Sequence, residues 1–132
     1  MTAAEQKEKA LAFLRTLENP DPAAIAPLIT DNFEFEMMGR LPGIQPIRGK
    51  ALFVQSMPAT LKAMFPTGLK MKFHTTISEG PHVAVQAESE AVAANGKKYA
   101  NRYHFYLRFD GDKIAQVREY NDVNHVREVF MS

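Results

Sequence analysis

The sequence predicts an α+β domain in which three helices precede a strongly bent, mixed or antiparallel sheet. Two observations support this prediction. Apolar residues recur at helical spacing over residues 3–18 and again from Lys50 onward. After Pro66 they alternate with polar residues in segments joined by turn sequences such as Asn95-Gly96. Helices followed by a meander of strands are typical of α+β domains rather than of parallel α/β domains.

The first half of the chain carries the helix signals. Thr2 and Glu5 form a capping-box pattern that starts the first helix, which we expect to end at Asn19-Pro20. Asp21-Pro22 predicts the start of a short second helix. A third helix is predicted from Lys50, and its internal proline should kink or divide it.

Strands alternate with turns in the rest of the sequence. Before the third helix, residues 33–37 alternate as a strand and residues 39–49 form a loop with two prolines and three glycines. Four more strands are expected, over residues 69–78, 82–93, 99–109 and 113–121. A bent sheet with helices against its concave side would make a cone, whose open end is a natural ligand cavity.

Composition excludes several classes of protein. The 132 residues predict a single domain, residues 1–132, and the net charge of +1 argues against a nucleic-acid partner. There is no cysteine, and the four histidines lack the spacing of a metal pair, so we expect no metal and no cofactor. A charged N-terminal segment and the absence of long apolar runs predict a cytoplasmic protein without signal peptide or membrane partner.

Two hairpin registers place acidic side chains around one point. If Asn95-Gly96 is a two-residue turn, Glu88 lies opposite Tyr103. If Asp110-Gly111-Asp112 is a three-residue turn, Glu119 faces Tyr103 from the other side. The two glutamate Cα atoms would then lie about 10 Å apart. Two carboxyl groups in an apolar cone cannot both ionise cheaply, so one would hold a proton beside a base.

An alternative register stays open at this point. On the strand that carries Glu88, the apolar residues occupy the opposite face: they are Val83, Val85 and Ala87. If that face points inward, Glu88 is solvated. A two-residue turn at Gly111-Asp112 would likewise replace Glu119 by Tyr120.

The end of the chain carries a family resemblance. Residues 99–105, 110–114 and 117–122, followed by His125, resemble the SnoaL-like, ketosteroid-isomerase-related group of the nuclear transport factor 2-like superfamily. That resemblance implies a cystatin-like α+β barrel. The superfamily includes isomerases, dehydratases, polyketide cyclases and epoxide hydrolases, as well as binding and assembly modules.

The resemblance leaves both known catalytic sets incomplete. The two glutamates fall where the epoxide hydrolases carry their acidic pair, but Phe35 and Met37 replace the tyrosine and asparagine that position water. Glu36 falls near the base of the ketosteroid isomerases, whereas Phe105 replaces the acid of their oxyanion hole. The resemblance therefore implies the fold but does not identify the reaction.

We predict a cofactor-free isomerase, lyase or hydrolase that acts on a small, largely apolar or amphipathic molecule containing oxygen. Glu88 and Glu119 would divide the acid and base roles, and Tyr103 and Asn101 would bind the substrate oxygen. The pocket wall would include Phe35, Met37 and Phe105. The alternative is a non-catalytic ligand-binding or dimerising module of the same fold.

Two further features receive less weight. Asp122 and His125 follow the last strand and either reach the cavity mouth or pin the chain terminus. His104 and Tyr106 alternate to the outer face of the sheet, where they offer a two-fold contact. Because members of the superfamily commonly dimerise, the resemblance implies a homodimer.

Overall fold

The computed structural model describes residues 1–131 and consists of one strongly curled, seven-stranded sheet with helices. The strands follow the order β2-β1-β7-β6-β4-β3, and β5 pairs with β4. The sheet is mixed because β1 runs parallel to β7, whereas the other pairs are antiparallel. The strands are β1 (Ile29–Met37), β2 (Ile47–Arg48), β3 (Lys70–Glu79), β4 (His82–Val92), β5 (Lys98–Tyr99), β6 (Arg102–Asp110) and β7 (Lys113–Asn121).

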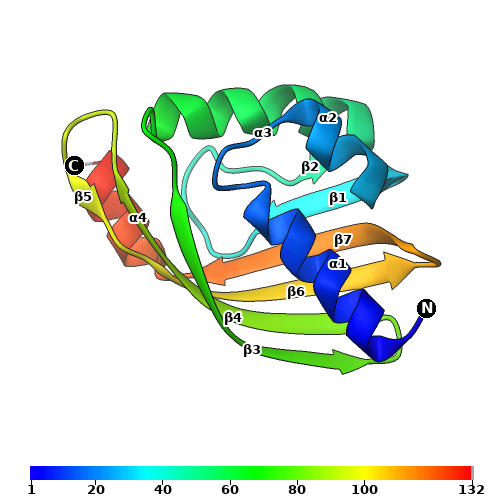
Figure 1. Ribbon diagram of the computed structural model, residues 1–132. Helices are drawn as coiled ribbons and strands as arrows, with labels where there is room; N and C mark the ends of the chain where they lie inside the picture. The colour runs from blue at the N-terminus through cyan, green and yellow to red at the C-terminus, as the bar shows by residue number, and fades with distance from the viewer. Residues whose placement is uncertain (132) are drawn as a thin grey trace.

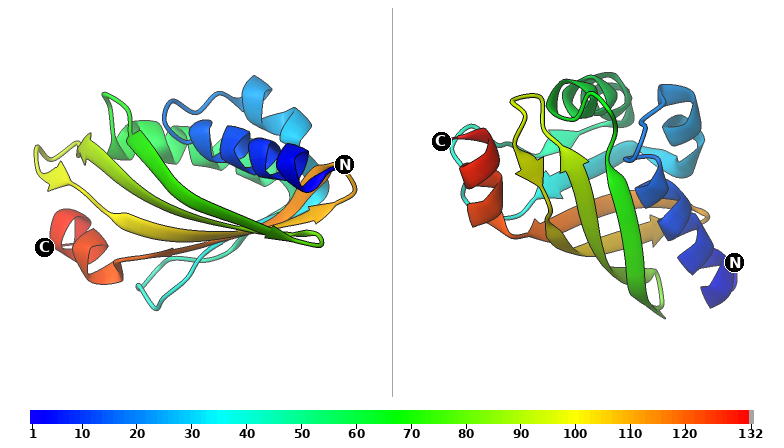
Figure 2. Two further views of the ribbon diagram at one scale, coloured as in Figure 1. Left: turned by 60° about the horizontal axis from the view of Figure 1, so that its bottom comes forward. Right: turned by 60° about the vertical axis from the view of Figure 1, so that its left-hand side comes forward.

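Three helices lie on the concave side of the curled sheet, and a fourth lies at its end (Figure 1). They are α1 (Ala3–Arg15), α2 (Pro22–Ile25), α3 (Lys50–Met64) and α4 (Val123–Phe130); a 3₁₀ turn (Ala26–Leu28) follows α2. The left view of Figure 2 shows that none of these four helices covers the convex side. The predicted α+β cone is therefore confirmed, with α4 as an addition that the sequence analysis did not anticipate.

The predicted helix starts are confirmed by their capping contacts. The Thr2 hydroxyl accepts a hydrogen bond from Glu5 N, and Glu5 Oε1 accepts one from Thr2 N. Asp21 Oδ1 accepts a bond from Ala23 N at the start of α2. Pro58 does not divide α3, because the helix continues on both sides of this buried residue, and the alternative of a kink stays a prediction.

The centre of the core is a cluster of phenylalanine rings where α1, β1 and α3 meet. The ring centroids of Phe33 and Phe53 lie 4.8 Å apart, and Phe13 lies 5.7 Å from Phe33. All three side chains are fully buried. This cluster fastens the helices to the parallel β1–β7 side of the sheet.

The turn between β4 and the following strands is one residue longer than predicted. Ala93 N donates to the carbonyl of Lys97 at 2.8 Å, so the turn contains three residues, and Gly96 takes the left-handed conformation with a φ of 85°. The register therefore places Ala87 opposite Tyr103. The predicted pairing of Glu88 with Tyr103 is wrong.

The β6–β7 register differs from the prediction by two residues. The turn is the two-residue form at Gly111-Asp112, and an extra residue, Ala115, then bulges out of β7. Glu119 consequently lies opposite Phe105 instead of Tyr103. Because the two shifts add to an even number, Glu119 still faces the concave side, as predicted.

Candidate functional site

Glu119 places a carboxyl group on the concave side of the sheet, among apolar residues. Its Cα partners are Met37 on β1 and Phe105 on β6. Part of the Glu119 surface remains accessible, yet surrounding protein desolvates the carboxyl and raises its pKa from 4.5 to about 7. The Asn121 side chain opposes this shift, since Nδ2 donates to Glu119 Oε2 at 2.7 Å. Glu119 is thus an acid that titrates near neutral pH.

A chain of buried hydroxyl groups occupies the same side of the sheet. Ser89 Oγ and Tyr103 OH lie 2.8 Å apart, and Tyr103 OH donates to Tyr99 OH at 3.2 Å. Burial, with a smaller contribution from the charge of Glu119, raises the pKa of Tyr99 to about 12 and that of Tyr103 well above its ordinary value. Both phenols are therefore neutral donors. The sequence analysis missed Ser89, although it shares its face of β4 with Ala87.

Asn101 is buried and holds the backbone around this hydroxyl chain. Its Oδ1 accepts bonds from Arg102 N at 2.7 Å and from Asp122 N at 3.0 Å. Its Nδ2 donates to Tyr99 OH at 2.9 Å and to the carbonyl of Asp122 at 3.3 Å. These partners occupy the side chain, so it positions Tyr99 rather than offering a free group for the substrate bond that was predicted.

Glu88 lies outside this site. Its side chain is 46% exposed, and its Oε2 lies 3.5 Å from His74 Nε2. Its Cα partners are Lys72 and Arg102, both solvent-exposed. The predicted convergence of two glutamates is wrong because the longer β4–β5 turn moved Glu88 to the outer face. The open alternative, in which Val83, Val85 and Ala87 face inward, is the one that the structure adopts.

The apolar residues predicted for the pocket wall do lie on the concave side. The Phe35 ring packs 5.5 Å from Phe53, and the Phe105 ring stacks 5.0 Å from Tyr103. Met37 is partly buried beside Glu119. Their contact with a substrate stays a prediction.

Glu36 and the C-terminal pair have other positions. Glu36 alternates to the outer face of β1 with Arg118 as its Cα partner, so it is not close to the inner site. Asp122 Oδ1 accepts from His125 N and caps α4. His125 Nε2 accepts from Ala100 N at 3.0 Å, and its ring stacks on Tyr99. The pair therefore pins the terminal helix to the sheet.

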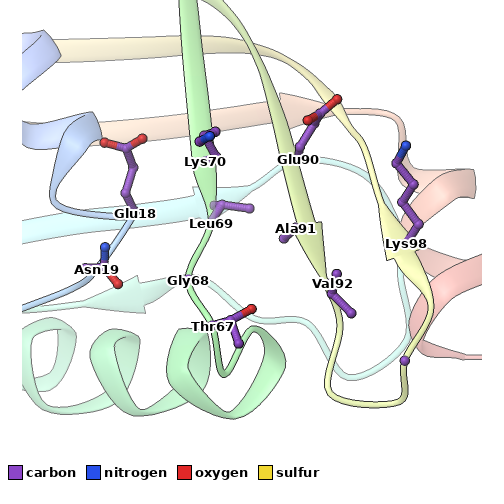
Figure 3. Close-up of a pocket in the computed structure, with 11 residues that line it drawn as sticks. Glu18, Asn19, Thr67, Gly68, Leu69, Lys70, Glu90, Ala91, Val92 and Lys98 are labelled. Atoms are coloured by element: carbon purple, nitrogen blue, oxygen red, sulfur yellow. The ribbon is translucent and has the colours of Figure 1, made fainter.

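Two pockets lie away from Glu119. A pocket of about 600 Å³ opens where β3, β4 and β5 diverge, and Figure 3 shows charged side chains of both signs on its wall, namely Glu18, Lys70, Glu90 and Lys98. A second pocket, of about 510 Å³, lies between the loop after β1 and α4. None of the predicted site residues lines either one. The expected cavity in front of Glu119 therefore stays a prediction.

Two further features are absent from residues 1–131. No helix there combines the length and the apolar character needed to cross a membrane. No three histidine, aspartate or glutamate side chains there gather in a way that could hold a metal ion.

Solved structures share this fold across nearly the whole chain. An NTF2-like protein from Burkholderia xenovorans LB400 has a TM-score of 0.79 and 15% identity, with 98% of each chain covered. The BvnE pinacolase from Penicillium brevicompactum has a TM-score of 0.80 and 20% identity, covering 95% of this chain and 91% of its own. An LEH-like epoxide hydrolase from M. tuberculosis has a TM-score of 0.76 and 18% identity, covering 98% and 91%. These likenesses show the fold alone.

The sequence itself identifies the family. No curated protein is significantly similar to this chain. The family model of the SnoaL-like domain, in contrast, matches residues 10–117, which is most of the chain. Together with the NTF2-like and ketosteroid-isomerase-like structures, this match shows that the protein belongs to the SnoaL-like domain family of the NTF2-like superfamily.

Proposed function

We propose that this protein is a cofactor-free acid–base enzyme of the isomerase, lyase or hydrolase type, with Glu119 as its proton-transfer group. One observation carries the proposal. The Glu119 carboxyl group on the concave side has a pKa raised to about 7 by burial, which is near the value that favours proton transfer in both directions at neutral pH. The substrate would be small and largely apolar, because Met37 and Phe105 flank the group on the two neighbouring strands.

Glu119 could both accept a proton from the substrate and return it, while Asn121 holds its carboxyl group in place. As a carboxylate, Glu119 would accept a proton from a substrate C–H or from a water molecule. As a carboxylic acid, it would return that proton to carbon or to a leaving oxygen, so that one residue serves both steps. Asn121 Nδ2 fixes the orientation of the carboxyl by its bond to Oε2.

Tyr99 is the donor best placed to bind a substrate oxygen. Its hydroxyl oxygen accepts bonds from Tyr103 OH and Asn101 Nδ2, which leaves its own hydrogen to donate. Accepting two bonds polarises the O–H and strengthens it as a donor. Tyr103 would then act through Tyr99, which refines the substrate contact predicted from the sequence.

A substrate screen tests the proposal. The purified protein is incubated with a cyclic epoxide, a β-hydroxyketone and a β,γ-unsaturated ketone, which represent ring opening, dehydration and isomerisation. The proposal requires turnover of at least one class, lost in Glu119→Gln and kept in Glu88→Gln, which is matched in chemistry but lies on the outer face. Activity that persists in Glu119→Gln would remove this residue from the mechanism.

A non-catalytic binding module is the second candidate. It is favoured by one observation: Glu88, the second acid of the predicted pair, lies on the outer face. In that case an apolar oxygenated ligand would raise the melting temperature and be recovered chemically unchanged. Recovery of a converted product would instead support the enzyme.

We further propose that the protein forms a homodimer through the convex face of the sheet. No helix covers this face in the described chain, and Tyr120 there is 43% exposed. Arg118 Nε on the same face is buried without a hydrogen-bond partner among the described residues. Sedimentation velocity should show a dimer that the exposed-site variant His104→Glu dissociates; a wild-type monomer would contradict the proposal.

A further inference from the structure

A pocket of about 510 Å³ lies at the end of the parallel β1–β7 pair, outside the residues assigned to proton transfer. One wall is the loop that follows β1, and the other is α4. The lining residues are Arg40, Leu41, Pro42, Val123, Arg127 and Met131. This volume lies within the range of small-molecule sites.

Local geometry brings the two walls together. Val123 and Arg127 are four residues apart, so α4 presents both on one face, and Met131 lines the pocket directly after the helix ends. The loop approaches so closely that a Cβ at Gly39 would lie 2.7 Å from Val123 Cγ2. Gly39 also has a φ of 113°, which favours glycine. The pocket is therefore built by a specific close packing of loop and helix.

The charged residues that line the pocket, Arg40 and Arg127, are both positive. Arg40 and Arg127 are exposed, and neither takes part in an ion pair or side-chain hydrogen bond with the described residues. The nearby acids of α4 do not line the pocket: Asp122 caps the helix, and Glu128 Oε1 accepts from Asn124 Nδ2. Leu41, which is 7% exposed, lines the same pocket and contributes an apolar part of its wall.

We propose that this pocket binds a small amphipathic acid, with its carboxylate between Arg40 and Arg127 and its apolar body against Leu41 and Val123. Guanidinium groups match carboxylates by paired hydrogen bonds, and an apolar wall beside them excludes a fully hydrated inorganic anion. The larger pocket, in contrast, carries two lysines and two glutamates and so has no preference for an anion. The inference goes beyond the proposed catalysis and does not depend on it.

The probe pair octanoate and 1-octanol tests the proposal, because the two molecules share a chain and differ in charge. Amide chemical shifts of the ¹⁵N-labelled protein are followed at low salt during each titration. Octanoate should shift the amides of Leu41, Val123 and Arg127 in a saturable way and bind more tightly than octanol. Added NaCl should weaken only octanoate, since it screens the exposed arginines.

Single charge-removing variants complete the test. Arg40→Gln and Arg127→Gln should each raise the Kd for octanoate about three- to tenfold and leave octanol unchanged. Lys70→Gln removes the same charge from the larger pocket and should have no effect. Equal affinity for the two probes, shifts confined to other residues, or an unchanged Kd in both arginine variants would overturn the proposal. Each of these readouts is independent of whether Glu119 catalyses a reaction.

Discussion

Glu88 and Glu119 are chemically identical groups on two strands of one sheet, and the two faces give them opposite properties. Glu88 is 46% exposed and lies beside His74 on the outer face. Glu119 lies on the concave side, where burial raises its pKa to about 7. Solvent screens the first charge, whereas the second must be desolvated whenever it forms. Position on the sheet therefore makes Glu119 the desolvated one of two chemically identical groups.

A single residue in a turn sets this difference. A three-residue turn after Ala93 shifts the β4 register by one position relative to a two-residue turn, and an odd shift moves Glu88 to the other face. In β7 the shorter turn and the bulge at Ala115 together shift the register by two, and an even shift keeps Glu119 inside. A one-residue register shift therefore moves a side chain to the other face of the sheet, whereas two such shifts together leave it on the same face.

The largest expected difference between the two faces is in turnover. Glu119→Gln should lower kcat/KM by about 100- to 10,000-fold, because it removes the group that gives and takes the proton. Glu88→Gln should leave kcat/KM unchanged. The two variants are compared by steady-state kinetics on whichever substrate the screen identifies. Equal losses of kcat/KM in the two variants would contradict a catalytic role that belongs to the concave face alone.

Stability should respond to pH through Glu119. Its pKa rises from 4.5 in the unfolded chain to about 7 in the folded protein, so the folded state binds this proton more tightly. The resulting stabilisation is fully present below pH 4.5 and is lost as the pH rises through about 7, at a cost of about 3 kcal/mol. Glu119→Gln cannot lose a proton, so relative to wild type it should gain about this much between pH 4 and pH 9.

Urea unfolding at the two pH values measures this effect. Glu88→Gln, which removes an equal charge from the outer face, controls for the change in net charge. A stability difference between Glu119→Gln and wild type that is the same at both pH values would contradict the burial of an ionisable Glu119.

Two tyrosines on β6 allow the inner and outer faces to be compared without a change of charge. Tyr103 OH lies in the buried chain with Ser89 and Tyr99, whereas Tyr106 OH lies 2.6 Å from His82 Nδ1 near the surface. Tyr103→Phe should cost about 1 kcal/mol of unfolding free energy, because it leaves buried partners unpaired. Tyr106→Phe should cost less, since water replaces the lost bond. Equilibrium denaturation that ranks them in the reverse order would contradict this difference between the faces.

The smallest effect is expected at the contact between His74 and Glu88 on the outer face. His74 Nε2 and Glu88 Oε2 lie 3.5 Å apart, and both side chains are more than 40% exposed. A double-mutant cycle of His74→Gln and Glu88→Gln should give a coupling energy below about 0.5 kcal/mol. A coupling energy of several kcal/mol would show that this pair is far less solvated than described.

Strand alternation was enough to predict which residues of β6 face inward, because side chains alternate with a period of two whatever the register. Tyr103, Phe105 and Asn101 are all buried as expected. Cross-strand partners were not predictable, since Asn95-Gly96 suits a two-residue turn and only the backbone geometry shows the longer one. The bulge did leave a trace, because Ile114 and Ala115 are consecutive apolar residues.

The terminal helix α4 was predictable in principle and was missed. Asp122 is a good N-cap, and Val126 and Val129 recur at helical spacing after it. Of the two alternatives given for Asp122 and His125, the contacts with His125 N and Ala100 N show the one in which the pair pins the chain terminus.

The most direct test of the account is the titration of the Glu119 carboxyl carbon by ¹³C NMR, with Glu119→Gln used to assign its signal. We expect an apparent pKa near 7, because desolvation of the Glu119 carboxyl outweighs the hydrogen bond from Asn121. A midpoint near the ordinary value of 4.5 would contradict it, because a solvated carboxyl of that pKa would hold almost no proton at neutral pH.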